Sequence, residues 1–369
     1  MIPTESDVLR RLSAAGLKPP KVVTLSITNR CNLSCRHCWP SSGPSDSAPA
    51  IPKGQVFQAI EGFAAMGAET LTITGGEPLT HPEWIDLLCF ACSRPGVKEV
   101  RLQTNAILLT SSHLDALAAF ADCGLIIQTS LEGATSRAHD RVRGPGSFEA
   151  TIKGLRLLLN SGFGSQLCVT FTEMEHNFEE LPDLLEMVDR MGIGEFASGT
   201  LVYGGRAKQG ADLQPPTPRQ YEKLITRYQL DHSFRERYQR IGNIAALEWA
   251  AATSDPVEPC CTFIERPYVT TEGLLYPCVF LHADDYAATE AYERPLTLAI
   301  LEKIDSWSRL QQIQHSRLSQ LETCKDCGEY ARCGGGCMGR AYAAHGSFLA
   351  AEDRCSLRKA VYGWQSAVR

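Results

Sequence analysis

Residues 26–38 read Ser-Ile-Thr-Asn-Arg-Cys-Asn-Leu-Ser-Cys-Arg-His-Cys, so three cysteines stand at the spacing C-x3-C-x2-C directly after an apolar segment that predicts a β-strand. Three close thiolates can hold three irons of a cubane [4Fe–4S] cluster and leave the fourth iron open to a small molecule, which an electron carrier does not need. A zinc knuckle is the alternative, but zinc takes four ligands and His37 lies too close to the cysteines to complete a tetrahedron. We therefore predict that Cys31, Cys35 and Cys38 ligate a catalytic cluster.

The sequence around this motif repeats one unit, a short apolar strand followed by an amphipathic helix. Apolar runs predict strands at Val22–Thr28, Thr70–Thr74, Glu99–Gln103, Leu125–Leu131, Gln166–Thr172 and Glu195–Val202. Apolar residues that recur at three and four predict helices at Lys53–Met66, Pro82–Ser93, Ser112–Asp122, Ser147–Leu159 and Phe178–Met191. Alternating units of this kind form a parallel sheet that is covered on both faces and winds right-handedly. The predicted fold class is α/β, a partial (β/α)6 TIM-like barrel.

Active sites of such barrels gather at the C-terminal ends of the strands, and the polar motifs of this chain lie there. They are the cysteine motif, Gly75-Gly76-Glu77-Pro78, Thr104-Asn105 and Ser130-Leu131-Glu132-Gly133. Adjacent glycines let a ligand approach the backbone, and Glu77 or neighbouring carbonyls can accept hydrogen bonds from an ammonium group. Ser130 offers a hydroxyl. The guanidinium of Arg143 has paired N–H donors that suit a carboxylate ligand. The alternative is that Arg143 forms a salt bridge on the protein surface.

The cysteine spacing, its place after a strand and the Gly75–Pro78 motif resemble the radical S-adenosylmethionine (SAM) enzymes. The resemblance implies that the open iron chelates the methionine part of SAM and that an electron from the cluster yields a 5′-deoxyadenosyl radical. It implies an adenine contact at His37 and contacts to ribose or carboxylate at Ser130 and Arg143. Members commonly read Ser-Leu-Asp-Gly where this chain has Glu132. The cofactor-binding residues that we predict are His37, Gly75, Gly76, Glu77, Pro78, Asn105, Ser130 and Arg143.

A second group of cysteines lies in the last third of the chain: Cys260, Cys261, Cys278, Cys324, Cys327, Cys333, Cys337 and Cys355. Its spacing resembles the SPASM domain, an iron–sulfur extension at the C-terminus of radical SAM enzymes. The resemblance implies two auxiliary [4Fe–4S] clusters, and three clusters in all. One would use Cys261, Cys278 and Cys337, and the other Cys324, Cys327, Cys333 and Cys355. Cys260 either ligates the first of these or does not, because adjacent residues reach one cluster only with a strained backbone. A zinc ribbon would leave Cys261, Cys278 and Cys355 unexplained.

The predicted parts of the chain are an N-terminal segment (1–20), the radical SAM partial barrel (21–215), a helical bridge (216–259) and the SPASM domain (260–369). The polar stretch Tyr203–Arg219 is expected to form a loop at the barrel mouth. The remaining cysteines lie beside apolar runs or in a helix and are expected to be structural, as buried thiols: Cys89, Cys92, Cys123 and Cys168.

Composition fits a globular enzyme with a large core, since the 369 residues are 44% hydrophobic and 21% charged. No apolar run is long enough to span a membrane, and residues 1–20 lack a signal-peptide pattern, so we expect a cytoplasmic protein. A net charge of −6 argues against nonspecific binding to nucleic acid. Fifteen cysteines in such a chain indicate metal ligation for those that cluster.

Three function classes follow from the resemblance. The leading one is a maturase that oxidatively modifies a ribosomally made peptide, by thioether or carbon–carbon crosslinking or a related oxidation. The second is a small-molecule enzyme that alters propionate side chains of haem or another tetrapyrrole, since the tail Gly339–Cys355 is similar to that branch. The third, an iron–sulfur electron carrier, leaves the open-iron motif without a use.

The sequence singles out no catalytic acid or base, although Glu265, Asp284 and Asp285 are candidates for deprotonating the substrate. The expected partners are the peptide or small molecule and a reductase such as flavodoxin or ferredoxin. A separate protein that presents the peptide is also expected, since only residues 1–21 precede the first predicted strand.

Overall fold

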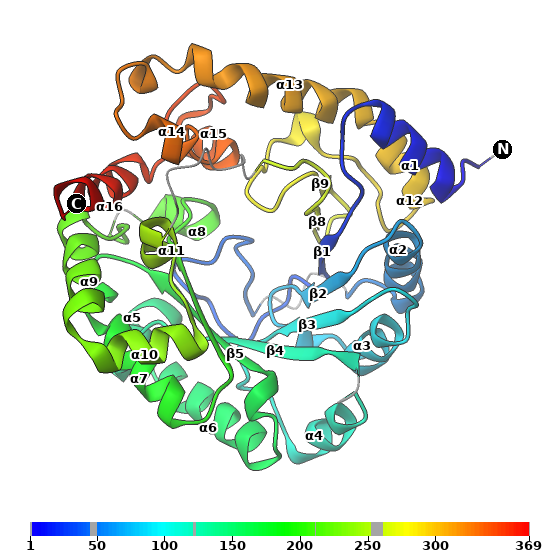
Figure 1. The fold of residues 1–369 in the computed structure, drawn as a ribbon. Coiled ribbons are helices and arrows are strands. Elements are labelled where there is room, and N and C mark those ends of the chain that lie inside the picture. The colour runs from blue at the N-terminus through cyan, green and yellow to red at the C-terminus, as the bar shows by residue number, and fades with distance from the viewer. Residues whose placement is uncertain (1, 45–49, 121–122, 211, 252–260, 369) are drawn as a thin grey trace.

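The computed structural model describes residues 2–44, 50–120, 123–210, 212–251 and 261–368. Its centre is a curved sheet of parallel strands, each hydrogen-bonded to the next one in the sequence (Figure 1). These strands are β1 (Val22–Ser26), β2 (Thr70–Thr74), β3 (Glu99–Gln103), β4 (Leu125–Ser130), β5 (Leu167–Glu173) and β6 (Glu195–Thr200). The α/β partial barrel that the sequence predicts is confirmed, with strand limits within two residues of those expected.

Helices surround the outside of the sheet (Figure 1). They are α2 (Lys53–Ala65), α3 (Trp84–Cys92), α4 (Ser111–Ala118), α5 (Ser136–Arg143), α6 (Ser147–Asn160), α7 (Leu181–Arg190), α9 (Pro218–Leu230), α10 (His232–Ile241) and α11 (Ala245–Ala251). The short helix α8 (Gly205–Gln209) lies inside this ring of helices (Figure 1). Their apolar faces make the core; α6, for example, buries Ile152, Leu155 and Leu158. The sequence did not predict α5, because this short polar helix lacks an apolar stripe.

The sheet continues beyond the six predicted strands at both edges. The strand β7 (Gly242–Asn243) pairs with β6, while β8 (Tyr268–Val269) pairs in parallel with β1 and β9 (Leu275–Tyr276) runs antiparallel to β8. Two-residue strands carry no alternation that a sequence reading could detect. Segments assigned to the helical bridge and to the C-terminal domain thus share one sheet with the barrel.

Residues after 260 lie across the gap between the two edges of the barrel (Figure 1). Near β1, the helix α12 (Leu296–Leu301) packs on α1 (Glu5–Ala14). The long helix α13 (Ile304–Gln320) runs from there toward α14 (Tyr330–Cys333) and α15 (Met338–His345). The last helix, α16 (Cys355–Val368), packs on α9 and α11. The cysteine-rich region therefore closes the ring of helices around the barrel mouth.

Three of the four cysteines that we expected to be buried thiols are not buried free thiols. Cys92 at the end of α3 forms a disulfide with Cys123, with the Cα atoms 5.4 Å apart, and Cys89 is exposed. The end of α3 faces the turn before β4, a contact that the sequence did not reveal. Cys168 in β5 is buried as expected, and this burial raises the pKa of its thiol to about 12. Among the described residues, no helix combines the length and apolar character that crossing a bilayer requires.

Candidate active site

A cavity of about 530 Å³ lies at the C-terminal ends of the parallel strands. Strand-end residues from β2 to β6 line it, including Thr74, Gln103, Gln128, Thr170 and Ser198, and the loop after β1 forms another wall. Residues with predicted cluster or cofactor roles that line it are Cys31, Cys35, Cys38, His37, Gly75, Gly76, Asn105, Ser130 and Arg143. The parallel sheet brings these separate motifs together, because all its strands end at one edge.

The cysteine loop presents thiols that need a cation. Cys31 and Cys35 are each 8% exposed, and burial raises the pKa of Cys31 to about 12. A thiolate at that position therefore requires a bound metal to balance its charge. In the described part of the chain, no three His, Cys, Asp or Glu side chains converge closely enough to hold a single metal ion. A cubane keeps its ligand sulfurs further apart, since each binds a different iron, so the donor set fits such a cluster.

The two glycines after β2 are required by packing against the cysteine loop. The Gly76 N–H donates to Thr28 O at 2.7 Å. A Cβ atom on Gly75 would lie 2.4 Å from Thr28 O, and one on Gly76 would lie 2.5 Å from Arg30 O. Both contacts are shorter than any side chain tolerates. The Gly-Gly pair thus lets the β2 loop lie directly on the loop after β1.

Glu77 and Pro78 do not line the cavity. The Glu77 carboxylate is 1% exposed and accepts hydrogen bonds from Leu79 N at 3.1 Å, Thr104 Oγ1 at 2.7 Å and Asn105 N at 2.7 Å. Burial raises the pKa of Glu77 to about 7, although these donors oppose the shift. The contact of a ligand ammonium group with this carboxylate or with neighbouring carbonyls stays a prediction. Glu77 holds the chain at Asn105, whose side chain is bonded to Asn32 and lines the cavity.

Arg143 is paired with a carboxylate inside the protein and is not a surface residue. Its Nε and Nη2 donate to Glu132 Oε1 at 3.1 and 2.7 Å, and Thr172 N donates to the other Glu132 oxygen at 2.8 Å. The Glu132 side chain is fully buried and that of Arg143 is 12% exposed. Burial by itself raises the pKa of Glu132, but the charges of Arg143 and His37 outweigh it and hold that pKa below its usual range. The sequence pointed to Glu132 only as a departure from the family pattern.

His37 lies beside this ion pair and also lines the cavity. Its Nε2 is 3.4 Å from Glu132 Oε1. Its Nδ1 is buried and has no hydrogen-bond partner among the residues that the structure describes. An unpaired buried polar atom is costly, so this nitrogen is suited to bind a group in the cavity.

Sequence reasoning missed Arg206, which holds the cysteine loop from the opposite side. Its Nε donates to Cys35 O at 2.8 Å, its Nη2 to Ser42 O at 2.6 Å, and its backbone N–H to Cys38 O at 3.1 Å. Arg206 lies on α8, within the stretch expected to form a loop at the barrel mouth, and it lines the cavity. No motif marked it, because its partners are backbone carbonyls distant in the sequence.

Four of the C-terminal cysteines lie together. Cys324, Cys327, Cys333 and Cys355 line one small pocket together, beside Glu352 and Arg358. Of the other predicted set, Cys261 and Cys337 are buried and Cys278 is half-buried. The segments that carry Cys278 and Cys337 are in contact, because a Cβ on Gly339 would lie only 2.7 Å from Phe280 O. Cys260 lies outside the described residues.

The carboxylates proposed as proton acceptors do not reach the cavity. Glu265, Asp284 and Asp285 are absent from its lining, and Asp284 accepts a hydrogen bond from Tyr276 at 2.7 Å. The described lining contains no acidic side chain. Phe280, two residues after Cys278, brings the C-terminal region to the cavity wall. Its backbone N–H donates to Cys278 Sγ at 3.5 Å.

A partial barrel whose strand ends meet Cys31, Cys35 and Cys38 at one cavity fits a barrel enzyme built around a metal-dependent cofactor site. Residues 25–188 match the radical SAM superfamily. These residues therefore form a radical SAM domain, and the chain is an enzyme.

Relatives match beyond that domain. The chain is 28% identical to the AdoMet-dependent heme synthase of Methanosarcina barkeri, over 92% of this chain and 97% of the relative. It is also 28% identical to the mycofactocin maturase MftC of Mycobacterium ulcerans, over 88% of this chain and 84% of the relative.

Two solved structures share the fold over nearly the whole chain. Native anSMEcpe with bound AdoMet and Kp18Cys peptide has a TM-score of 0.71 at 16% identity, and covers 95% of this chain and 98% of its own. Streptococcus suis SuiB bound to the precursor peptide SuiA has a TM-score of 0.68 at 18% identity, with coverage of 95% and 80%. The likeness therefore includes the cysteine-rich C-terminal region.

Proposed function

We propose that this enzyme reductively cleaves SAM and uses the resulting radical to abstract a hydrogen atom from a ribosomally synthesised peptide, which it modifies oxidatively. A thioether, a carbon–carbon crosslink or a related oxidation is the product. The observation that carries the proposal is the single cavity shared by Cys31, Cys35 and Cys38 and the predicted cofactor-binding side chains. Two structures of the same fold hold peptides, according to their descriptions.

A [4Fe–4S] cluster on these three cysteines would supply the electron that breaks the sulfonium bond of SAM. The residues of the chain bind and orient SAM. Gly75 and Gly76 expose backbone groups beside the cysteine loop, and Asn105 offers an amide to the cavity. Ser130, whose hydroxyl lies 3.0 Å from Thr170 Oγ1, offers a hydroxyl to the ribose or carboxylate. Arg143 keeps a positive charge at the wall while Glu132 balances it.

Two auxiliary [4Fe–4S] clusters complete the proposed cofactor set. Cys324, Cys327, Cys333 and Cys355 would hold one, supported by the pocket that they share. Cys261, Cys278 and Cys337 would hold the other, with Cys260 as the candidate further ligand. We propose that they accept the electron which the substrate radical loses, and that they belong to a SPASM domain over residues 260–369. The other parts of this division are residues 1–20, 21–215 and 216–259.

The proposed partners follow from this chemistry. A flavodoxin or ferredoxin would deliver electrons, and a separate protein would present the peptide. We place the enzyme in the cytoplasm, where electron carriers of this kind occur.

A tetrapyrrole with propionate side chains is the second candidate substrate. It is supported by the match to the Methanosarcina barkeri heme synthase, which extends over nearly the full length of both chains. The cavity offers Arg143 and Arg206 as cations that suit a substrate carboxylate.

The test is anaerobic reconstitution with iron and sulfide, followed by assay of 5′-deoxyadenosine with SAM and dithionite. Cys35→Ala should abolish release, whereas Cys168→Ala, a buried cysteine in β5 away from the cavity, should not. Absence of 5′-deoxyadenosine from the intact protein, or normal release by Cys35→Ala, contradicts the proposal. Mass spectrometry after incubation with a peptide encoded beside the gene, or with a propionate-bearing tetrapyrrole, then separates the two substrate classes.

A further inference from the structure

One short stretch, residues 200–206, connects the Cys31–Cys38 loop with the cysteine-rich C-terminal region. It begins at Thr200, the last residue of β6, and ends at Arg206, the second residue of α8. Thr200, Leu201, Val202 and Arg206 line the cavity, so the stretch is part of its wall. We call it the 200–206 segment.

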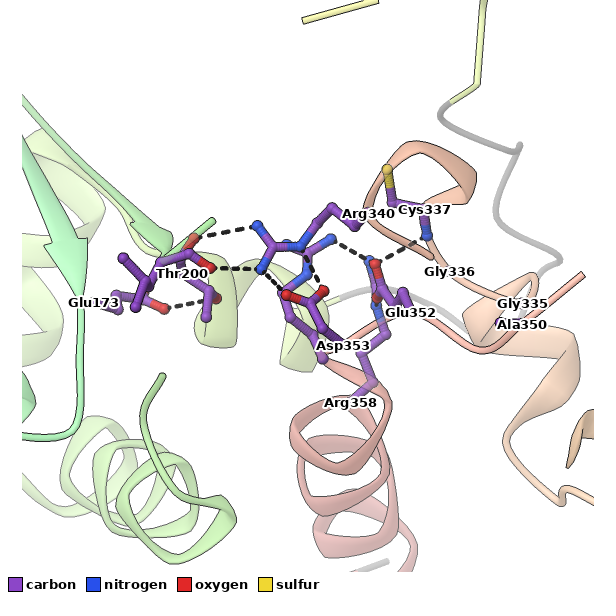
Figure 2. Close-up of polar contacts among 12 residues, drawn as sticks. Glu173, Thr200, Gly335, Gly336, Cys337, Arg340, Ala350, Glu352, Asp353 and Arg358 are labelled. Atoms are coloured by element: carbon purple, nitrogen blue, oxygen red, sulfur yellow. Dashed lines mark hydrogen bonds and ion pairs between the residues drawn. The ribbon is translucent and has the colours of Figure 1, made fainter. Parts of the chain in front are cut away.

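Arg340 anchors the first end of the segment to the C-terminal region (Figure 2). Its guanidinium donates to Thr200 O at 3.3 Å and Leu201 O at 2.6 Å, and also binds Asp353 at 2.8 and 2.6 Å. The residue is 3% exposed. Its donors are thus divided between the cavity wall and a carboxylate of the cysteine-rich region.

The same region holds Cys337 close to this anchor. Cys337 is the residue before α15, the helix that carries Arg340, and its N–H donates to Glu352 at 2.9 Å (Figure 2). Glu352 is next in sequence to Asp353 and pairs with Arg354 and Arg358. The position of α15 relative to β6 therefore depends on contacts around Cys337.

Arg206 anchors the other end of the segment to the cysteine loop, through its bonds to the carbonyls of Cys35, Cys38 and Ser42. The two glycines before it make the contact close. A Cβ on Gly204 would lie 2.5 Å from the Trp39 ring, and one on Gly205, whose φ is +49°, would lie 2.0 Å from Trp39 O. The segment and the cysteine loop therefore cannot shift independently.

We propose that Arg206 is a positioning residue for the Cys31–Cys38 loop, and that Arg340 acts on this loop through the 200–206 segment. The C-terminal cysteine region then sets the geometry in which SAM is bound and cleaved, although Arg340 does not line the cavity. This inference rests on the proposed function of the same site.

The test uses charge-preserving variants of the reconstituted enzyme, Arg206→Lys and Arg340→Lys, and the double variant. An ammonium group cannot serve several acceptors in the fixed directions of a guanidinium, so each substitution loosens one anchor but keeps the charge. Arg294→Lys is the matched control, because Arg294 also forms a two-point pair, at 2.7 Å to each Glu302 oxygen, but lies away from the segment. Amide hydrogen exchange of residues 31–43, the dissociation constant for SAM and the rate of 5′-deoxyadenosine release are measured.

Each single variant should speed exchange in residues 31–43 and weaken SAM binding by about tenfold, the effect of one lost charge-assisted hydrogen bond. The control should change neither. Because Arg340 acts through Arg206, the double variant should be no worse than Arg206→Lys, a non-additivity that two independent structural roles would not produce. Losses that multiply, or unchanged exchange in Arg340→Lys, overturn the inference. An intact enzyme that neither binds nor cleaves SAM refutes the proposed function instead, and the exchange data still report the coupling.

Discussion

Glu132→Gln should destabilise the protein strongly, because it removes the charge that balances buried Arg143. Both side chains are almost sealed from water, with exposures of 0% and 12%, and two hydrogen bonds of 3.1 and 2.7 Å join them. Glutamine can still accept from Thr172 N and occupies nearly the same space. Breaking a buried pair by removing one partner typically costs about 3–5 kcal/mol of unfolding free energy. We expect a loss in that range.

The assay is urea unfolding of the cluster-free protein, followed by circular dichroism at near-neutral pH. The pKa of Glu132 lies below its unfolded value, so its contribution is complete above the unfolded pKa and is lost as the pH falls toward the folded pKa. The difference between wild type and variant should therefore be largest near neutrality and shrink in acid.

Two comparisons separate charge pairing from a general effect of mutation. Glu132→Gln/Arg143→Met removes both charges and should recover much of the loss. Glu302→Gln breaks the Arg294 pair, in which Glu302 is 58% exposed, and should cost far less unfolding free energy, because water screens an exposed ion pair. Two results would contradict this account of the buried pair. One is a loss of unfolding free energy in Glu132→Gln that is no larger than in Glu302→Gln. The other is a loss in the double variant that equals the sum of the losses in its single variants.

Three further predictions concern the clusters and the strand ends. Reconstituted enzyme should hold about twelve irons and lose about four when Cys31, Cys35 and Cys38 become alanine; about four irons in the intact protein would exclude the auxiliary clusters. Cys327→Ala should still release 5′-deoxyadenosine without substrate turnover but should form much less modified substrate. A normal rate of substrate modification in the folded variant would mean that the auxiliary cluster held by Cys327 is only structural. Burial raises the pKa of Glu77 to about 7, so the ionised form is penalised in the fold, and its contribution to the unfolding free energy should decrease as the pH rises from the unfolded pKa to about 7 and then level off. Urea titrations should therefore show a larger decrease over this range in the wild type than in Glu77→Gln; equal decreases would contradict the prediction.

The fold and the core of the site could be predicted because they depend on local patterns. Short apolar runs alternate with segments in which apolar residues recur every three or four residues, and this alternation predicted the six parallel strands. Once the sheet is parallel, the strand ends must share one edge, so the motifs at Cys31–Cys38, Gly75-Gly76, Asn105 and Ser130 could be placed in one site before any coordinates. The spacing of the thiols likewise indicates metal ligation without tertiary information.

The orientation and pairing of individual polar side chains could be determined only from the tertiary structure. Glu77 occupies the expected loop but turns toward Thr104, and Arg143 is held by Glu132 rather than exposed. Arg206 lies in no motif that we identified, and the tail that contains Arg340 gave no sign of its contacts, because the acceptors of both side chains include main-chain carbonyls that any residue type supplies. Such bonds join positions 171 and 139 residues apart in the sequence.

The amino-acid sequence by itself therefore determined the six parallel strands and most of the helices between them, and it indicated which cysteines are candidates for metal ligation, since periodicity and spacing are properties of neighbouring residues. Only the tertiary structure decided how Arg340 and Arg206 connect the C-terminal region to the cysteine loop. A long side chain reaches its acceptor only after the backbone has brought distant segments together, and no local pattern encodes that distance.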